Sequence, residues 1–293
     1  MQFADIKDAS QQGKKKGETF TWDVVGNITR GDRALVETNT MGESDFTIAQ
    51  STLTISERGQ AVPYSGKLED LAMLPVRQPV MQALRNDANK DLDALCHAQF
   101  NATKLRVVGT STAAVSLTTT GTATSTNSQA LRHDHVKAIV DLMKERNIPA
   151  YQGDDYYAIA WPTTYRTFKN NLESINQYTS EGLKKIMNGE IGRYESCRFI
   201  EQTNIPKGGA ANSTTFSAYT NTADAWDNAL SDWVFFFGED TVAEAVACPL
   251  EMRAKIPSDY GRSKGVAWYW LGGYGLCHTS VSEVRVVKWD SAA

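Results

Sequence analysis

The sequence is poor in the residues that carry redox, nucleophilic or metal chemistry. It has four cysteines and four histidines in 293 residues. Cys96, Cys197, Cys248 and Cys277 lie far apart and form no CxxC pair, which excludes a disulfide scaffold and indicates buried thiols in a reducing compartment. The sequence also has no run of about 18 apolar residues, so we expect no helix that spans a membrane.

Other absences narrow the function further. The first ten residues, MQFADIKDAS, lack the apolar centre of a secretory signal. There are 30 Lys and Arg against 34 Asp and Glu, a formal net charge of −4, which excludes a surface that is basic all over and allows only a local basic patch. The phosphate-binding patterns GxGxxG and GxxxxGK and the nucleophile elbow GxSxG are absent, and the GGYG of residues 272–275 matches none of them.

Two short motifs invite a metal-binding interpretation. His133 and His135 flank an aspartate, but side chains two positions apart on a helix point about 200° away from each other and cannot face one ion. Asp154 and Asp155 are adjacent carboxylates, which can hold Mg²⁺, but which also suit a turn before a strand. We therefore predict no catalytic site, no metal and no cofactor, and we do not expect an enzyme.

Hydrophobic periodicity predicts a folded chain of helices and strands. The apolar fraction of 41 % and the length fit one large domain or two modest ones. Spacings of three and four between apolar residues predict helices over 79–99, about 30 Å long, and over 131–147, where Ser128 can act as the cap. A strand at 156–161 precedes a helix that starts at Pro162.

Two hairpins complete the predicted secondary structure. Residues 44–64 alternate between apolar and polar and contain a plausible turn at Glu57–Gly59, which predicts a long polar hairpin. Such a hairpin buries too little of its own surface to be stable alone, so we expect it to pack on another chain. Near the C-terminus, residues 265–277 and 281–289 are predicted to form an antiparallel pair with its bend at Thr279–Ser280.

One stretch points to a known family. GEIGRYE at residues 189–195, followed by RFIE at 198–201, is typical of a helix that ends at a glycine, a tight turn and a strand. The pattern resembles the major capsid proteins of tailed bacteriophages, in particular the N-four-type podophage coat family. From about residue 30 to 290, the order of arm, hairpin, long helix, second helix, strand–helix unit and closing strands resembles that family as well.

The resemblance implies an α+β chain with the Hong Kong 97 capsid fold. Its parts would be an N-terminal arm at 1–42, an E-loop hairpin at 43–70, a peripheral (P) domain at 71–155 with the spine helix 79–99, an axial (A) domain at 156–262 and a closing hairpin at 263–293 that returns to the P domain. The implied function is structural: hexamers and pentamers assemble in the cytoplasm of an infected bacterium into an icosahedral virion shell around double-stranded DNA. The implied partners are further copies of the chain, scaffolding and portal proteins, the packaged DNA and a decoration protein, and no membrane.

Three groups of residues acquire roles under this interpretation. We expect Gly189, Glu190, Gly192, Arg193 and Tyr194 to be architectural, because the glycines permit a positive φ and the tyrosine packs beneath the turn. Glu57 and Arg58, at the predicted E-loop tip, would pair with charges on the next subunit, unless they form only a solvated turn. Lys14, Lys15 and Lys16 would face the DNA, unless they belong to a solvated tail.

Three other functions stay open from the sequence. An encapsulin-type bacterial compartment has the same fold and encloses a cargo enzyme, and a fold alone does not separate it from a virus shell. A metal-dependent soluble enzyme would use His133 or the pair Asp154 and Asp155. A β-rich tail or adhesin protein would explain the stretches rich in Thr, Ser and Gly, and it would form trimers or fibres.

Overall fold

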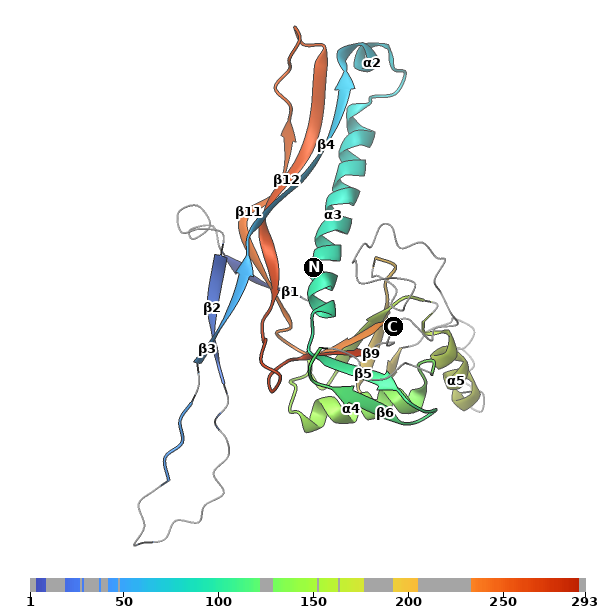
Figure 1. Cartoon of the computed structure of the whole chain (residues 1–293). Coiled ribbons are helices and arrows are strands. Elements are labelled where there is room, and N and C mark those ends of the chain that lie inside the picture. The colour runs from blue at the N-terminus through green and yellow to red at the C-terminus, as the bar shows by residue number, and fades with distance from the viewer. Residues whose placement is uncertain are drawn as a thin grey trace.

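A long helix and the elongated sheet beside it set the shape of the molecule. The computed structural model describes residues 4–8, 19–26, 28, 37, 42–46, 48–121, 129–151, 153–162, 164–176, 192–204 and 233–289. Within them a four-stranded sheet runs along the helix, a seven-stranded sheet lies beside one end of it, and a thin two-stranded arm points away (Figure 1). The separate helices and mostly antiparallel strands confirm the predicted α+β class.

Helix α3 (Arg77–Asn101) confirms the predicted long helix and extends it by two residues at each end. Its 25 residues make it roughly 38 Å long. One stripe of the helix is buried at four-residue intervals and packs on the aromatic side chains of the elongated sheet: Leu84, Ala88, Leu92, Cys96 and Phe100. The indole Nε1 of Trp268 also donates a hydrogen bond to Asp87 Oδ2 at 2.9 Å, so a polar contact joins the helix to the sheet as well.

The elongated sheet has the strand order β1-β11-β12-β4. Its strands are β1 (Ala4–Asp8), β11 (Val242–Ala254), β12 (Ser263–Leu276) and β4 (Ser56–Ser65). β12 pairs antiparallel with both β11 and β4, whereas β1 pairs parallel with β11. The short helix α2 (Gly66–Leu71) follows β4 at the free end, where the backbone N–H of Gly66 donates to the carbonyl of Arg262.

The seven-stranded sheet has the order β6-β5-β13-β10-β7-β9-β8 and forms the core of the more compact part. Its strands are β5 (Leu105–Gly109), β6 (Val115–Thr118), β7 (Tyr156–Ala160), β8 (Arg193–Tyr194), β9 (Cys197–Glu201), β10 (Val234–Phe237) and β13 (Val286–Trp289). Helices α4 (His133–Glu145) and α5 (Arg166–Asn176) belong to this part. The apolar residues predicted for the core face of α4 are fully buried: Val136, Ile139, Val140 and Met143.

Strand β10 joins the two hydrophobic cores. Period-two alternation sends Phe236 into the core that contains α4, while Phe235 and Phe237 enter the core beneath α3. All three phenylalanines are fully buried. The continuous aromatic run is therefore explained by a central strand with both faces covered.

The predicted hairpin at 44–64 is wrong. β3 (Ile48–Thr54) pairs with β2 (Thr19–Val25) to form the arm, whereas β4 pairs with β12, so no turn occurs at Glu57–Gly59. Residues 57–59 lie inside β4, with Arg58 opposite Trp270. Alternation correctly indicated two strands, but β3 pairs with the strand before it and β4 pairs with β12, far away in the chain. The two-stranded arm is thus formed by residues 19–25 and 48–54.

The predicted closing hairpin is also wrong. β12 lies in the elongated sheet, and β13 lies between β10 and β5 in the other sheet. All four residues of β13 are buried, as expected of a central strand rather than of one arm of an exposed hairpin. Strands β5 and β6 and helix α4 share a core or sheet with β7 and β10, and β11 belongs with the elongated sheet. The predicted domain boundaries stay a prediction.

The cap of α4 differs from the prediction. The helix starts at His133 and its N-cap is Arg132, whose backbone N–H donates to His135 Nδ1 at 3.2 Å. Ser128, which we had expected to cap the helix, lies outside the described residues.

Candidate assembly surfaces

The motif behind the family resemblance forms a tight hairpin at an edge of the seven-stranded sheet. β8 and β9 are joined by Glu195 and Ser196, with φ values of 48° and 58°, as in a type I′ turn. Gly192, just before β8, has a φ of 67°, where a side chain would be strained. The Tyr194 ring packs edge-on against Phe168 at a centroid distance of 5.7 Å. Gly189 and Glu190 lie outside the described residues.

This hairpin also binds one of the two candidate carboxylates. Arg193 and Arg198 lie opposite each other, and their Nε atoms are 2.6 Å and 2.7 Å from Oδ1 and Oδ2 of Asp155. The Asp155 side chain is only 6 % exposed, whereas both arginines are about half exposed. The hydrogen bond and the charge of Asp155 raise the pKa of Arg198. Both oxygens of Asp155 therefore face cations of the chain itself, and the arrangement links β7 to β9.

The two histidines of the HDH motif serve separate contacts. His133 Nε2 is 3.2 Å from Asp134 Oδ1 near the surface. His135 is fully buried; its Nδ1 accepts from the Arg132 backbone and its Nε2 lies 2.7 Å from the Ser111 carbonyl oxygen. Burial lowers the pKa of His135. The described residues contain no group of three or more potential metal ligands.

Glu57 and Arg58 do not lie at a tip, as the strand register shows. Glu57 is exposed, and Arg58 Nη1 lies 3.7 Å from Asp91 Oδ1 on α3 of the same chain. Their contact with a neighbouring subunit stays a prediction, now for the edge of the elongated sheet. Lys14, Lys15 and Lys16 lie outside the described residues.

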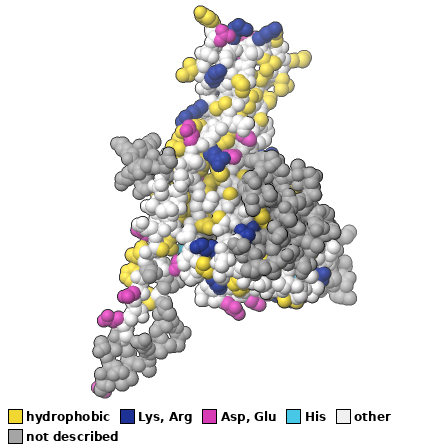
Figure 2. Space-filling view, viewed as in Figure 1, with side chains coloured by type: hydrophobic (Ala, Val, Ile, Leu, Met, Phe, Trp, Pro, Cys, Tyr) yellow, Lys and Arg dark blue, Asp and Glu magenta, His cyan; other side chains and the backbone are white. Residues whose placement is uncertain are grey.

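Two sets of exposed apolar side chains that were not predicted from the sequence lie at opposite extremities of the molecule. At the free end of the elongated sheet, Met73 and Tyr260 are fully exposed, and four further large apolar residues there are also exposed: Leu68, Leu71, Leu74 and Ile256. The arm exposes a second set: Val25, Ile28, Phe46 and Ile48. Figure 2 shows apolar side chains gathered at the free end and on the arm. The signal in the sequence was the run LEDLAML at 68–74, which has four large apolar residues within seven positions. A single short helix cannot bury all of them.

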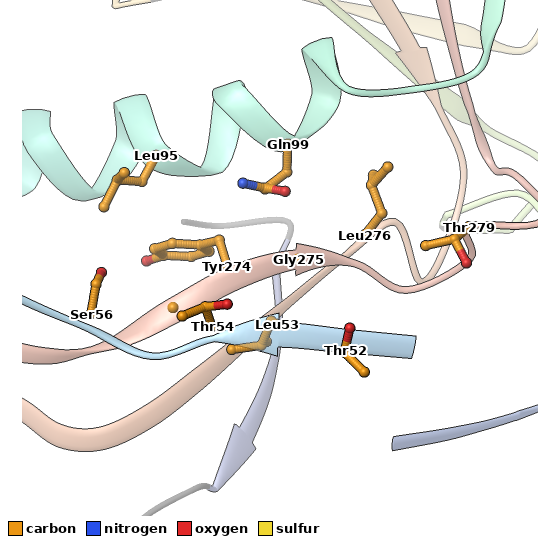
Figure 3. A pocket seen from close by; sticks show the side chains of 11 residues that line it. Thr52, Leu53, Thr54, Ser56, Leu95, Gln99, Tyr274, Gly275, Leu276 and Thr279 are labelled. Atoms are coloured by element: carbon orange, nitrogen blue, oxygen red, sulfur yellow. The ribbon is translucent and has the colours of Figure 1, made fainter. Parts of the chain in front are cut away.

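A cavity lies where the arm joins the body. Its volume is about 430 Å³, and its walls come from β3, from α3, and from the end of β12 and the loop after it as far as Thr279 (Figure 3). Leu95 and Gln99 point into it from the helix, and Thr52 and Thr54 line it from β3.

No helix of the described part of the chain is long and apolar enough to cross a membrane.

Comparison with known proteins finds similarity in structure only. No protein-family model and no curated protein matches the chain by sequence. The head structure of Helicobacter pylori bacteriophage KHP40 matches with a TM-score of 0.67 at 13 % identity, over 97 % of this chain and 86 % of that one. The capsid of Cyanophage P-SCSP1u matches with 0.66 at 15 %, over 99 % and 86 %, and the capsid of Ralstonia phage GP4 with 0.66 at 13 %, over 98 % and 87 %.

The chain therefore has the capsid fold of these bacteriophages, the Hong Kong 97 fold, over nearly its whole length. This confirms the fold that the family resemblance implied. How this chain divides into the N-terminal arm, E-loop, P domain and A domain of that fold stays a prediction; α3 covers the predicted spine helix 79–99.

Proposed function

We propose that the chain is a major capsid protein, which self-assembles as hexamers and pentamers into an icosahedral shell around double-stranded DNA. The observation that carries the proposal is the exposure of large apolar side chains at both extremities of a chain with this fold. Large apolar side chains gathered at one exposed end of a molecule mark contacts with other proteins.

The geometry explains how one chain builds a closed surface. Exposed apolar residues at both ends of an elongated body allow head-to-tail contacts between different patches. Such heterologous contacts form a ring when the rotation from one subunit to the next closes. A standard interface buries on the order of 1,600 Å², so each subunit needs several. The spine helix and the two sheets supply the rigid part, and the arm reaches beyond it.

The proposal assigns finer roles as well. The protein is structural and without catalytic activity, and it resides in the virion after assembly in the bacterial cytoplasm. Its partners are copies of itself, scaffolding and portal proteins, a decoration protein, and DNA, which Lys14, Lys15 and Lys16 contact without sequence preference. Glu57 and Arg58 belong to a contact with the adjacent subunit, and the Gly192–Tyr194 hairpin shapes the A domain.

Negative-stain electron microscopy and sedimentation of the expressed chain test the proposal. We expect capsomer-sized rings or closed shells from the wild type, and smaller species from a Leu71→Ser, Met73→Ser double variant, because it removes apolar surface at the free end. The matched control, Lys67→Ser with Asp70→Ser, changes two exposed polar residues of the same segment without changing net charge and should assemble normally. Equal assembly of both variants would contradict the role of the apolar end. Particles that contain a cargo protein instead of DNA would favour a bacterial compartment.

A further inference from the structure

The described part of the arm is anchored to the body at its root. On β3, Ser51 and Leu53 are buried while the residues farther out are exposed. Leu53 packs with Phe20 of β2 against Ala245 and Ala247 of β11. Ser51 Oγ donates to the carbonyl oxygen of Cys277, at 3.0 Å. These few contacts therefore set the position from which the whole arm extends.

The surface beneath the root is made of small residues. The β4 ladder on β12 ends with Ser56 opposite Gly272, and β3 crosses β12 at the glycines that follow. A Cβ on Gly273 would lie 2.3 Å from the Thr54 carbonyl oxygen, and a Cβ on Gly275 would lie 2.9 Å from Leu53 Cβ. Both distances are below 3.0 Å, which real Cβ contacts essentially never reach, so a side chain here would displace the arm root. The next atoms that either Cβ meets belong to the arm too, including the Trp22 ring at 3.4 Å from the Gly275 position.

The side of the root that faces α3 is open. The cavity of about 430 Å³ separates Thr52 and Thr54 from Leu95 and Gln99 of the helix (Figure 3). A methyl group at Gly273 would project from the face of the sheet toward the arm and not into the ladder between β11 and β12, in which Gly273 pairs with Ala245.

We propose that Gly273 and Gly275 are positioning residues for the arm: they form a flat seat on β12 that fixes the direction in which the arm leaves the body. This explains the GGYG motif, which matches no phosphate-binding pattern. The direction of the arm matters for assembly only if the proposed function is right, because the arm would then reach the neighbouring subunit; to that extent the inference rests on the proposed function.

Amide hydrogen exchange of the unassembled full-length chain tests the seat directly. In Gly273→Ala we expect exchange of residues 19–25 and 48–54 to rise by about tenfold or more while exchange of β11 and β12 stays unchanged, because only the arm root loses its contact surface. The matched control is Gly265→Ala on the same strand, where the first contact of the new Cβ is at 3.3 Å and involves β4 rather than the arm. Gly275→Ala is the milder variant if Gly273→Ala does not fold, since it meets side-chain atoms first.

The outcomes separate the seat from the proposed function. The seat is refuted if exchange of the arm is the same in Gly273→Ala and Gly265→Ala. It is also refuted if Gly273→Ala or Gly275→Ala raises exchange over the whole body while Gly265→Ala does not. If Gly273→Ala raises exchange in the arm alone but the wild-type chain never assembles, the seat is supported and the capsid function is refuted. Arm-specific exchange together with wild-type shells from Gly273→Ala would refute the assembly purpose of the seat.

Discussion

In the cluster of Asp155, Arg193 and Arg198, we expect removal of the two arginines to lower the stability more than removal of the carboxylate. Asp155 is buried and its two partners are half exposed, so the carboxylate depends on the arginines more than they depend on it. In Asp155→Asn both guanidinium groups turn to water, and the loss is that of one charge-assisted hydrogen bond from Arg198 and one ion pair with Arg193, about 2 kcal/mol. In the double variant Arg193→Ala, Arg198→Ala a buried carboxylate loses its counter-charges, which costs about 3–5 kcal/mol.

Urea unfolding of the unassembled chain at neutral pH measures this order. Arg193→Ala alone should cost about 1 kcal/mol, since Arg198 remains on Oδ2. The decisive variant adds Asp155→Asn to the double arginine variant, because it removes the unpaired charge. We expect it to recover part of the lost stability. If the triple variant is no more stable than the double one, the carboxylate is not held by these arginines and the reasoning fails.

Three further perturbations have defined outcomes. Gly192→Val should abolish folding or capsomer closure, because valine is strained at a φ of 67°, and normal particles by electron microscopy would refute this. Phe236→Ala should lower the free energy of unfolding by about 3–5 kcal/mol, measured in urea, because the side chain is fully buried between sheet and helix. Burial lowers the pKa of His135 below its ordinary 6.5, so its neutral form stabilises the fold above that pH and stability falls as the pH drops below it. His135→Gln should flatten the decrease of the thermal midpoint between pH 6.5 and 5 without abolishing it, since burial also lowers the pKa of His278; an unchanged slope would contradict the assignment.

The candidate site could be predicted only in part. The sequence indicated that residues 189–201 contain a glycine-marked turn and a strand, and that Asp155 precedes a strand. That Asp155 lies between two arginines depends on the parallel pairing of β7 with β9, which places Tyr156 opposite Cys197. Segments about 40 residues apart carry no mark of that register. The same holds for GGYG, whose glycines are needed only because β3 crosses above them.

What the sequence determined by itself is local: which segments are helices or strands and which side of each is apolar. Helices α3 and α4 and strand β7 were predicted because their periodicity depends only on nearby residues and on the burial of one face. Which strands pair was decided by the tertiary structure. β3 and β4, and likewise β12 and β13, are consecutive in the chain and lie in different sheets, because alternation specifies the buried face of a strand and not its neighbour. The arm and its seat follow from that choice of partners.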